Sequence, residues 1–96
     1  MIRTALTVST AHMSYDDSVK VQVSKGNGVP LFSQYDEGMI MYKPSEKDEM
    51  VEEMSRAGYS SVMVNLFVYA FFELGVDLLI MDADGLELKG FPTFNW

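Results

Sequence analysis

Two helix patterns follow each other directly in the second half of the chain, so any fold of this chain has to accommodate two consecutive helices. The first covers residues 45–57, with Ser45 as the expected N-cap and Gly58 as its end. The second covers residues 62–74 and is ended by Gly75. Because the second is apolar around most of its circumference, we expect it to be buried on most sides.

Short β-patterns surround this helical pair. Residues 2–9 alternate apolar and polar side chains, which is typical of a half-buried strand. Residues 31–34 and 39–43 flank a glycine-containing turn and predict a hairpin. Residues 76–81 and 86–88 flank an Asp-Gly turn and predict a second hairpin.

Two stretches are less regular. Residues 13–25 alternate like a strand at three valines, but Ser14 and Asp17 also form a helix start, so strand and helix both remain open. A turn is expected at Gly26-Asn27-Gly28. The aromatic tail, residues 91–96, is expected to pack back on the body.

This order of elements predicts one domain over residues 1–96. Strands before and after a pair of helices are typical of an α+β fold. We expect a small, mainly antiparallel sheet with two or three helices packed on one face.

Composition excludes several classes of function. The 96 residues contain no cysteine and one histidine, which rules out disulfides, thiolate nucleophiles and multi-histidine metal sites. The net charge of −7 disfavours direct binding to nucleic acid or to anionic lipid. No segment has the length and apolarity of a signal peptide or membrane span, so we expect a cytoplasmic protein in a bacterial host.

The acidic residues supply the candidate binding surface. They follow one face of the first helix and the turn of the first hairpin, and a face of this kind is either simply solvated or suited to a basic protein partner. The candidates are Asp36, Glu37, Glu46, Asp48, Glu49, Glu52 and Glu53.

Two further motifs carry possible chemistry. Asp82-Ala83-Asp84-Gly85 resembles the start of a calcium loop, but Thr93 stands where the closing glutamate is needed, so an Asp-Gly turn is the simpler interpretation. His12 lies beside hydroxyl side chains without the elbow motif of a serine hydrolase, and it fits a packing role. We expect no metal and no cofactor.

Several motifs in order resemble a small family of uncharacterised bacterial and phage proteins, a domain of unknown function. The resemblance covers nearly the whole chain and implies a fold with a helix after the first strand, but no catalytic residue. Phe91 and Asn95 depart from the family's tail. The motifs are Val8-Ser9-Thr10-Ala11-His12, Tyr35-Asp36-Glu37-Gly38, Tyr42-Lys43-Pro44, Gly75-Val76-Asp77, Asp82-Ala83-Asp84-Gly85 and the segment Gly90 to Trp96.

By size and charge the chain is also similar to phage inhibitors of CRISPR systems. We therefore expect a non-enzymatic inhibitor, a monomer or weak dimer, that binds a basic nucleic-acid groove on a host defence complex such as a CRISPR surveillance complex. One alternative is a small enzyme that uses His12 with Asp82 or Asp84. The other is an adaptor that binds through a surface of methionine and aromatic side chains.

Overall fold

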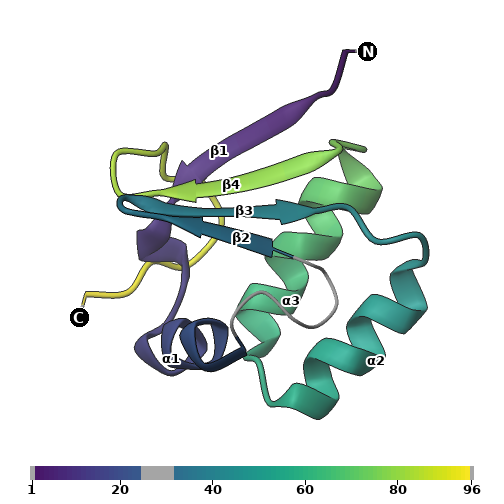
Figure 1. Ribbon diagram of the computed structural model, residues 1–96, viewed down its shortest axis with the longest axis horizontal. Coiled ribbons are helices and arrows are strands. Elements are labelled where there is room, and N and C mark those ends of the chain that lie inside the picture. Colours follow the sequence, from purple (N-terminus) through teal and green to yellow (C-terminus); the bar gives the residue numbers. More distant parts are fainter. Residues whose placement is uncertain (1, 25–31, 96) are drawn as a thin grey trace.

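The computed structural model describes residues 2–24 and 32–95, and it has the expected α+β architecture. A four-stranded sheet forms one layer, and three α-helices lie on one of its faces (Figure 1). In chain order the elements are β1 (Ala5–Ser9), the 3₁₀ turn η1 (Thr10–His12), α1 (Tyr15–Ser24), β2 (Phe32–Tyr35), β3 (Gly38–Tyr42), α2 (Lys47–Ala57), α3 (Ser61–Val68), the π-helical turn η2 (Tyr69–Glu73) and β4 (Leu78–Asp82).

The sheet is mostly antiparallel, in the strand order β1-β4-β3-β2. β2 with β3 and β3 with β4 run antiparallel, whereas β1 runs parallel to β4. The parallel pair joins the first strand of the chain to the last, so residues 10–77 form the connection between them. That connection carries the helices and the β2–β3 hairpin.

The predicted second hairpin is wrong. Residues 86–88 form no strand, and Leu86 makes only an isolated parallel bridge to Val8. The reason is that β4 is bonded to β1 on one side and to β3 on the other, which leaves no edge for an antiparallel partner. The chain instead turns at Gly85 and crosses the end of β1, where a Cβ on Gly85 would lie 2.2 Å from the Val8 carbonyl oxygen.

The first strand is shorter than predicted. It begins at Ala5 because its partner β4 begins at Leu78, opposite Ala5 in the register. The residue before the strand, Thr4, contributes its carbonyl, which accepts from the Leu78 N–H at 3.1 Å. Ile2, where the apolar alternation starts, is 96% exposed.

Helix boundaries follow local capping signals with one exception. The segment after Ser14 is a helix, and the Ser14 hydroxyl accepts from the Asp17 N–H at 3.1 Å. The backbone stays extended through Glu46 (φ −132°, ψ 134°), so Glu46 and not Ser45 occupies the N-cap position of α2. Gly58, at φ 91°, ends α2 in the left-handed conformation that glycine adopts without a steric penalty.

The second predicted helix has two parts. α3 is capped by Ser60, whose hydroxyl accepts from the Met63 N–H at 3.2 Å. It continues into the π-helical turn η2, in which the N–H of Leu74 donates to the carbonyl of Tyr69 at 2.8 Å. The turn predicted at Gly26-Asn27-Gly28 and the predicted strand start at residue 31 lie outside the described residues.

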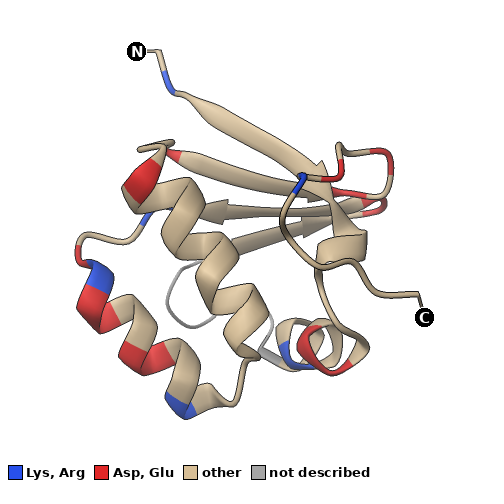
Figure 2. Cartoon of the chain, turned by 180° about the vertical axis from the view of Figure 1, so that it is seen from behind, with Lys and Arg blue, Asp and Glu red and all other residues tan. Residues whose placement is uncertain are grey.

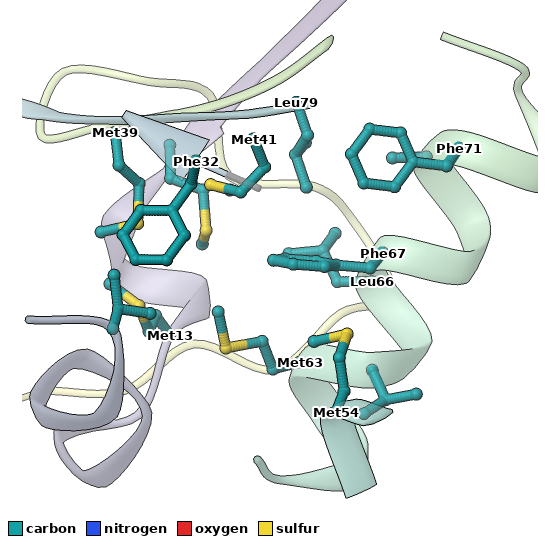
Figure 3. Close-up of a cluster of buried hydrophobic side chains, with 14 of the residues drawn as sticks. Met13, Phe32, Met39, Met41, Met54, Met63, Leu66, Phe67, Phe71 and Leu79 are labelled. Carbon is teal, nitrogen blue, oxygen red and sulfur yellow. The ribbon is translucent and has the colours of Figure 1, made fainter. Parts of the chain in front are cut away.

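Methionine and phenylalanine fill the space between the sheet and the helices (Figure 3). Seven of the eight methionines are buried, including Met39 and Met41 of β3 and Met50 and Met54 of α2. The rings of Phe67 and Phe71 meet edge to face, with centroids 5.9 Å apart. The described methionines therefore belong to the core and leave no methionine surface for a partner.

Candidate functional site

The outer face of α2 carries five of the predicted carboxylates. Met50 and Met54 anchor the opposite face in the core, so the acidic side chains point to solvent. We call this the α2 acidic face; its members are Glu46, Asp48, Glu49, Glu52 and Glu53.

One arginine neutralises part of the α2 acidic face. Arg56 donates to Glu53 at 2.8 Å and also to Glu52, and its side chain is 61% exposed. Exposed pairs of this kind contribute between 0 and about 1 kcal/mol each, so they orient the side chains more than they stabilise the helix. Within residues 2–24 and 32–95 these are the only ion pairs, which leaves the carboxylates at the start of the helix unpaired.

The structure does not bring all seven predicted residues together. Asp36 and Glu37 form the turn between β2 and β3, at the end of the sheet away from α2 (Figures 1 and 2). β3 leaves that turn and runs for five residues, about 16 Å, before the chain leads to α2. The predicted acidic surface is thus two surfaces on opposite sides of the domain.

The hairpin turn has acidic neighbours that the sequence analysis did not place with it. Gly38 lies opposite Asp82 in the β3–β4 register, and the N–H of Ala83 donates to the carbonyl of Glu37 at 2.8 Å. We call this group the sheet-end acidic surface, defined by Asp36, Glu37, Asp82 and Asp84.

Within the sheet-end acidic surface, the carboxylate of Asp82 is held in place by two hydrogen bonds. The Tyr35 hydroxyl donates to one oxygen at 2.6 Å, and the Asp84 N–H donates to the other at 2.8 Å. These two bonds lower the pKa of the Asp82 carboxyl. In return, the hydrogen bond to Asp82, with partial burial and nearby negative charge, raises the pKa of Tyr35 to about 12.

The Asp-Gly motif is a turn, as predicted. The N–H of Gly85 donates to the Asp82 carbonyl at 2.9 Å. In the part of the chain that the structure describes, no three carboxylate or imidazole groups are arranged to hold a metal ion.

A groove of about 480 Å³ adjoins the sheet-end acidic surface. It opens between α1 and the β2–β3 hairpin, and its walls carry amide, hydroxyl and carboxylate groups that accept hydrogen bonds. The lining residues are Thr10, Met13, Ser18, Gln22, Gln34, Tyr35, Asp36, Glu37, Gly38 and Met39.

His12 is buried, with 1% of its surface exposed, and both ring nitrogens are hydrogen-bonded. Nε2 accepts from the Leu88 N–H at 2.7 Å, so the proton sits on Nδ1, which donates to the Pro92 carbonyl at 2.8 Å. The Phe91 ring packs edge-on against the imidazole. His12 therefore holds the C-terminal tail in place, and neither nitrogen is exposed to a substrate.

The tail packs back on the body, as expected. Phe91 lies against Tyr69 with ring centroids 5.2 Å apart, and the N–H of Phe94 donates to the Ala11 carbonyl at 2.7 Å. These contacts connect the Ser-Thr-Ala-His motif directly to the tail motif.

The sequence did not predict that the carboxylate of Asp17 is buried. Asp17 is 1% exposed and accepts from the N–H of Ser60 at 2.9 Å and from its hydroxyl at 2.5 Å. It links the start of α1 to the N-cap of α3. The pattern around Ser14 indicated only that Asp17 starts a helix.

These features define a small α+β domain with two separated acidic surfaces and a histidine-anchored tail. The chain belongs to a family of unknown function, DUF5983: residues 5–96 match the model of the family's C-terminal domain. Comparison with curated proteins and with solved structures found no match. Among the described residues, no helix has the length and apolarity needed to cross a membrane.

Proposed function

We propose that this domain is a non-enzymatic inhibitor that docks its α2 acidic face on a basic protein surface. The target class is the nucleic-acid groove of a host defence complex, such as a CRISPR surveillance complex. The charge of the α2 acidic face is the observation that carries the proposal.

The charge density of this face is within about a factor of two of that of a nucleic acid. From Glu46 to Glu53 an α-helix rises about 10 Å and carries five carboxylates; Lys47 in the same segment and Arg56, which bridges Glu52 and Glu53, leave a net negative charge per roughly 3 Å. Duplex DNA carries one charge per about 1.7 Å of its axis. A cationic groove that binds phosphates would therefore meet a comparable field along α2.

The helix also presents these charges in a fixed arrangement. Met50 and Met54, both essentially unexposed, hold α2 against the core, and Gly58 fixes its end. Because the backbone of α2 is already ordered, docking costs no further backbone entropy, and only the exposed side chains have to be ordered. The acidic net charge of −7 further favours rapid encounter with a basic partner.

The test is a competition assay with a purified CRISPR surveillance complex and its DNA target. The wild-type domain is expected to reduce DNA binding. The triple variant Glu46→Lys, Asp48→Lys, Glu49→Lys is expected to lose this effect. These three carboxylates have no ion-pair partner within the described residues, so their charge is available to a basic partner until the lysines reverse it.

A matched control reverses the same number of charges on the opposite side of the domain. Asp36→Lys, Glu37→Lys, Asp84→Lys alters the sheet-end acidic surface and is expected to inhibit like the wild type. Equal loss in both triple variants would assign inhibition to net charge alone and refute the α2 acidic face as the site. Circular dichroism checks that both variants are folded.

The other two functions remain predictions without a supporting observation. An enzyme would need His12 to work with Asp82 or Asp84, but the imidazole is engaged by the tail and Asp82 by Tyr35. An adaptor would have to use other apolar groups than the buried methionines.

A further inference from the structure

The groove described above runs along the outer edge of β2. This strand ends the sheet on the side away from β1, and α1 lies across the groove from it (Figure 1). Gln34, Tyr35 and the turn residues line one wall, whereas α1 and the segment before it line the other. A strand edge that faces a helix across a groove is an arrangement in which an extended peptide binds as an additional strand.

The backbone of Gln34 offers a donor and an acceptor on this edge. The N–H of Lys43, which directly follows β3, donates to the Asp77 carbonyl at 3.0 Å, so the odd-numbered residues of β3 bond to β4. Its even-numbered residues therefore bond to β2, where their partners are Ser33 and Tyr35. The N–H and C=O of Gln34 point outwards, and no described residue bonds to them.

The edge of β2 lacks the features that keep sheet edges from pairing. Proteins protect exposed edges with charged side chains, prolines or bulges. The strand Phe32-Ser33-Gln34-Tyr35 contains no charge and no proline, and its ladder with β3 is regular. The edge is therefore suited to accept a further strand at Gln34.

The lining of the groove indicates what that strand carries. Asp36 and Glu37 are exposed at the turn, and no lysine or arginine is among the lining residues. Met13 and Met39 are buried lining residues and give the groove an apolar part. The matching ligand has a basic side chain for the carboxylates and an apolar one for the methionines. The β2 strand of a second copy has no basic side chain, so it does not match.

We propose that the groove binds an extended basic segment of a partner protein as a fifth strand, antiparallel to β2. The peptide residue opposite Gln34 exchanges two backbone hydrogen bonds with it and places an apolar side chain on the helix side of the sheet, towards Met13. The residue two positions earlier in the peptide lies beside Asp36 and is lysine or arginine. The recognised pattern is thus basic, any, apolar. This site is separate from the α2 acidic face and does not depend on the function proposed for it.

The test is an NMR titration of the isotope-labelled whole chain, at low salt, with the end-capped peptide Thr-Lys-Thr-Leu-Thr-Val-Thr. We expect the amide signals of the groove residues to shift, that of Gln34 among them, with a dissociation constant below about 1 mM. The reversed peptide Thr-Val-Thr-Leu-Thr-Lys-Thr has the same composition and charge but places lysine at the far end, and it is expected to bind roughly two- to fivefold more weakly. Absence of shifts up to about 1 mM, or equal binding of the two peptides, overturns the proposal.

N-methylation of the peptide tests the strand pairing without altering the protein. In the proposed register the leucine N–H donates to the Gln34 carbonyl, whereas the N–H of the threonine that follows points away from β2. Methylation of the leucine nitrogen is expected to weaken binding about fivefold or more, and methylation of that threonine nitrogen to leave it within about twofold. Equal effects of the two methyl groups would show that the peptide does not pair with β2.

Two charge-neutralising variants test where the lysine binds. Asp36→Asn with Glu37→Gln is expected to abolish the difference between the two peptides, because the carboxylates at the groove are gone. Glu52→Gln with Glu53→Gln removes as many carboxylates from the α2 acidic face and is expected to preserve the difference; the reverse result overturns the proposal. It is also overturned if spermidine, a cation without a peptide backbone, shifts the same signals, or if the Gln34 signal moves with protein concentration alone, as a second copy on this edge would require. Circular dichroism shows that both variants are folded.

Discussion

Removal of the Asp17 carboxylate is expected to cost this domain a large part of its stability. In Asp17→Ala, the N–H and the hydroxyl of Ser60 lose their acceptors, and the link between α1 and the α3 N-cap is broken. A hydrogen bond to a charged group contributes about 1.5–3 kcal/mol. Because Ser60 is only half-buried, water replaces part of what is lost, and we expect a total of about 2–4 kcal/mol.

Thermal and urea unfolding followed by circular dichroism measure this loss. For a domain of this size, 1 kcal/mol shifts the midpoint by about 4–8 °C, so the expected decrease is roughly 10–30 °C. Asp16→Ala is the matched control, since Asp16 is the exposed neighbour in the same helical turn and contributes about 0.5 kcal/mol through the helix dipole. If Asp17→Ala is no less stable than Asp16→Ala, the hydrogen bonds to Ser60 do not stabilise the fold.

Three further perturbations follow from the contacts described above. His12→Ala leaves two backbone groups of the tail without partners. We expect faster hydrogen exchange over residues 86–95 and a decrease of about 2–4 kcal/mol in the free energy of unfolding. Unchanged exchange would refute the role of His12 in holding the tail. Tyr35→Phe removes a hydroxyl whose pKa is raised in the folded state. The wild type therefore loses a stabilising contribution between about pH 10 and 12 that the variant lacks, as a comparison of the two stability profiles would show. Gly85→Ala forces a Cβ against the backbone of Val8, and chemical denaturation should show a loss of about 1–3 kcal/mol.

Local signals in the sequence predicted local structure well. Ser14 starts α1 and Gly58 ends α2, because each of these effects depends on backbone groups within a few residues; the N-cap predicted at Ser45 is the exception, since Glu46 takes that position. The Asp-Gly turn at Gly85 is likewise present. The hairpin inferred from it is absent because hairpin formation depends on whether β4 has a free edge, and the edge is taken by β1, some 70 residues earlier in the chain.

The positions of the acidic residues show the same difference between local and long-range information. Helical periodicity was sufficient to place the carboxylates of α2 on one face, since it depends only on spacing. It could not show that Asp36 and Glu37 lie beside Asp82, because that depends on the register of two strands far apart in sequence. The burial of Asp17 depends on a contact with Ser60, 43 residues away, and no local pattern encodes it.

Salt dependence tests the docking of the α2 acidic face. Docking on a basic groove is an attraction between exposed charges, and raising the salt concentration weakens it. We therefore expect the dissociation constant for the basic partner to rise between about 50 mM and 500 mM NaCl, where the Debye length falls from roughly 14 Å to 4 Å. An affinity that stays the same over this range would show that uncharged contacts, and not the α2 acidic face, hold the partner.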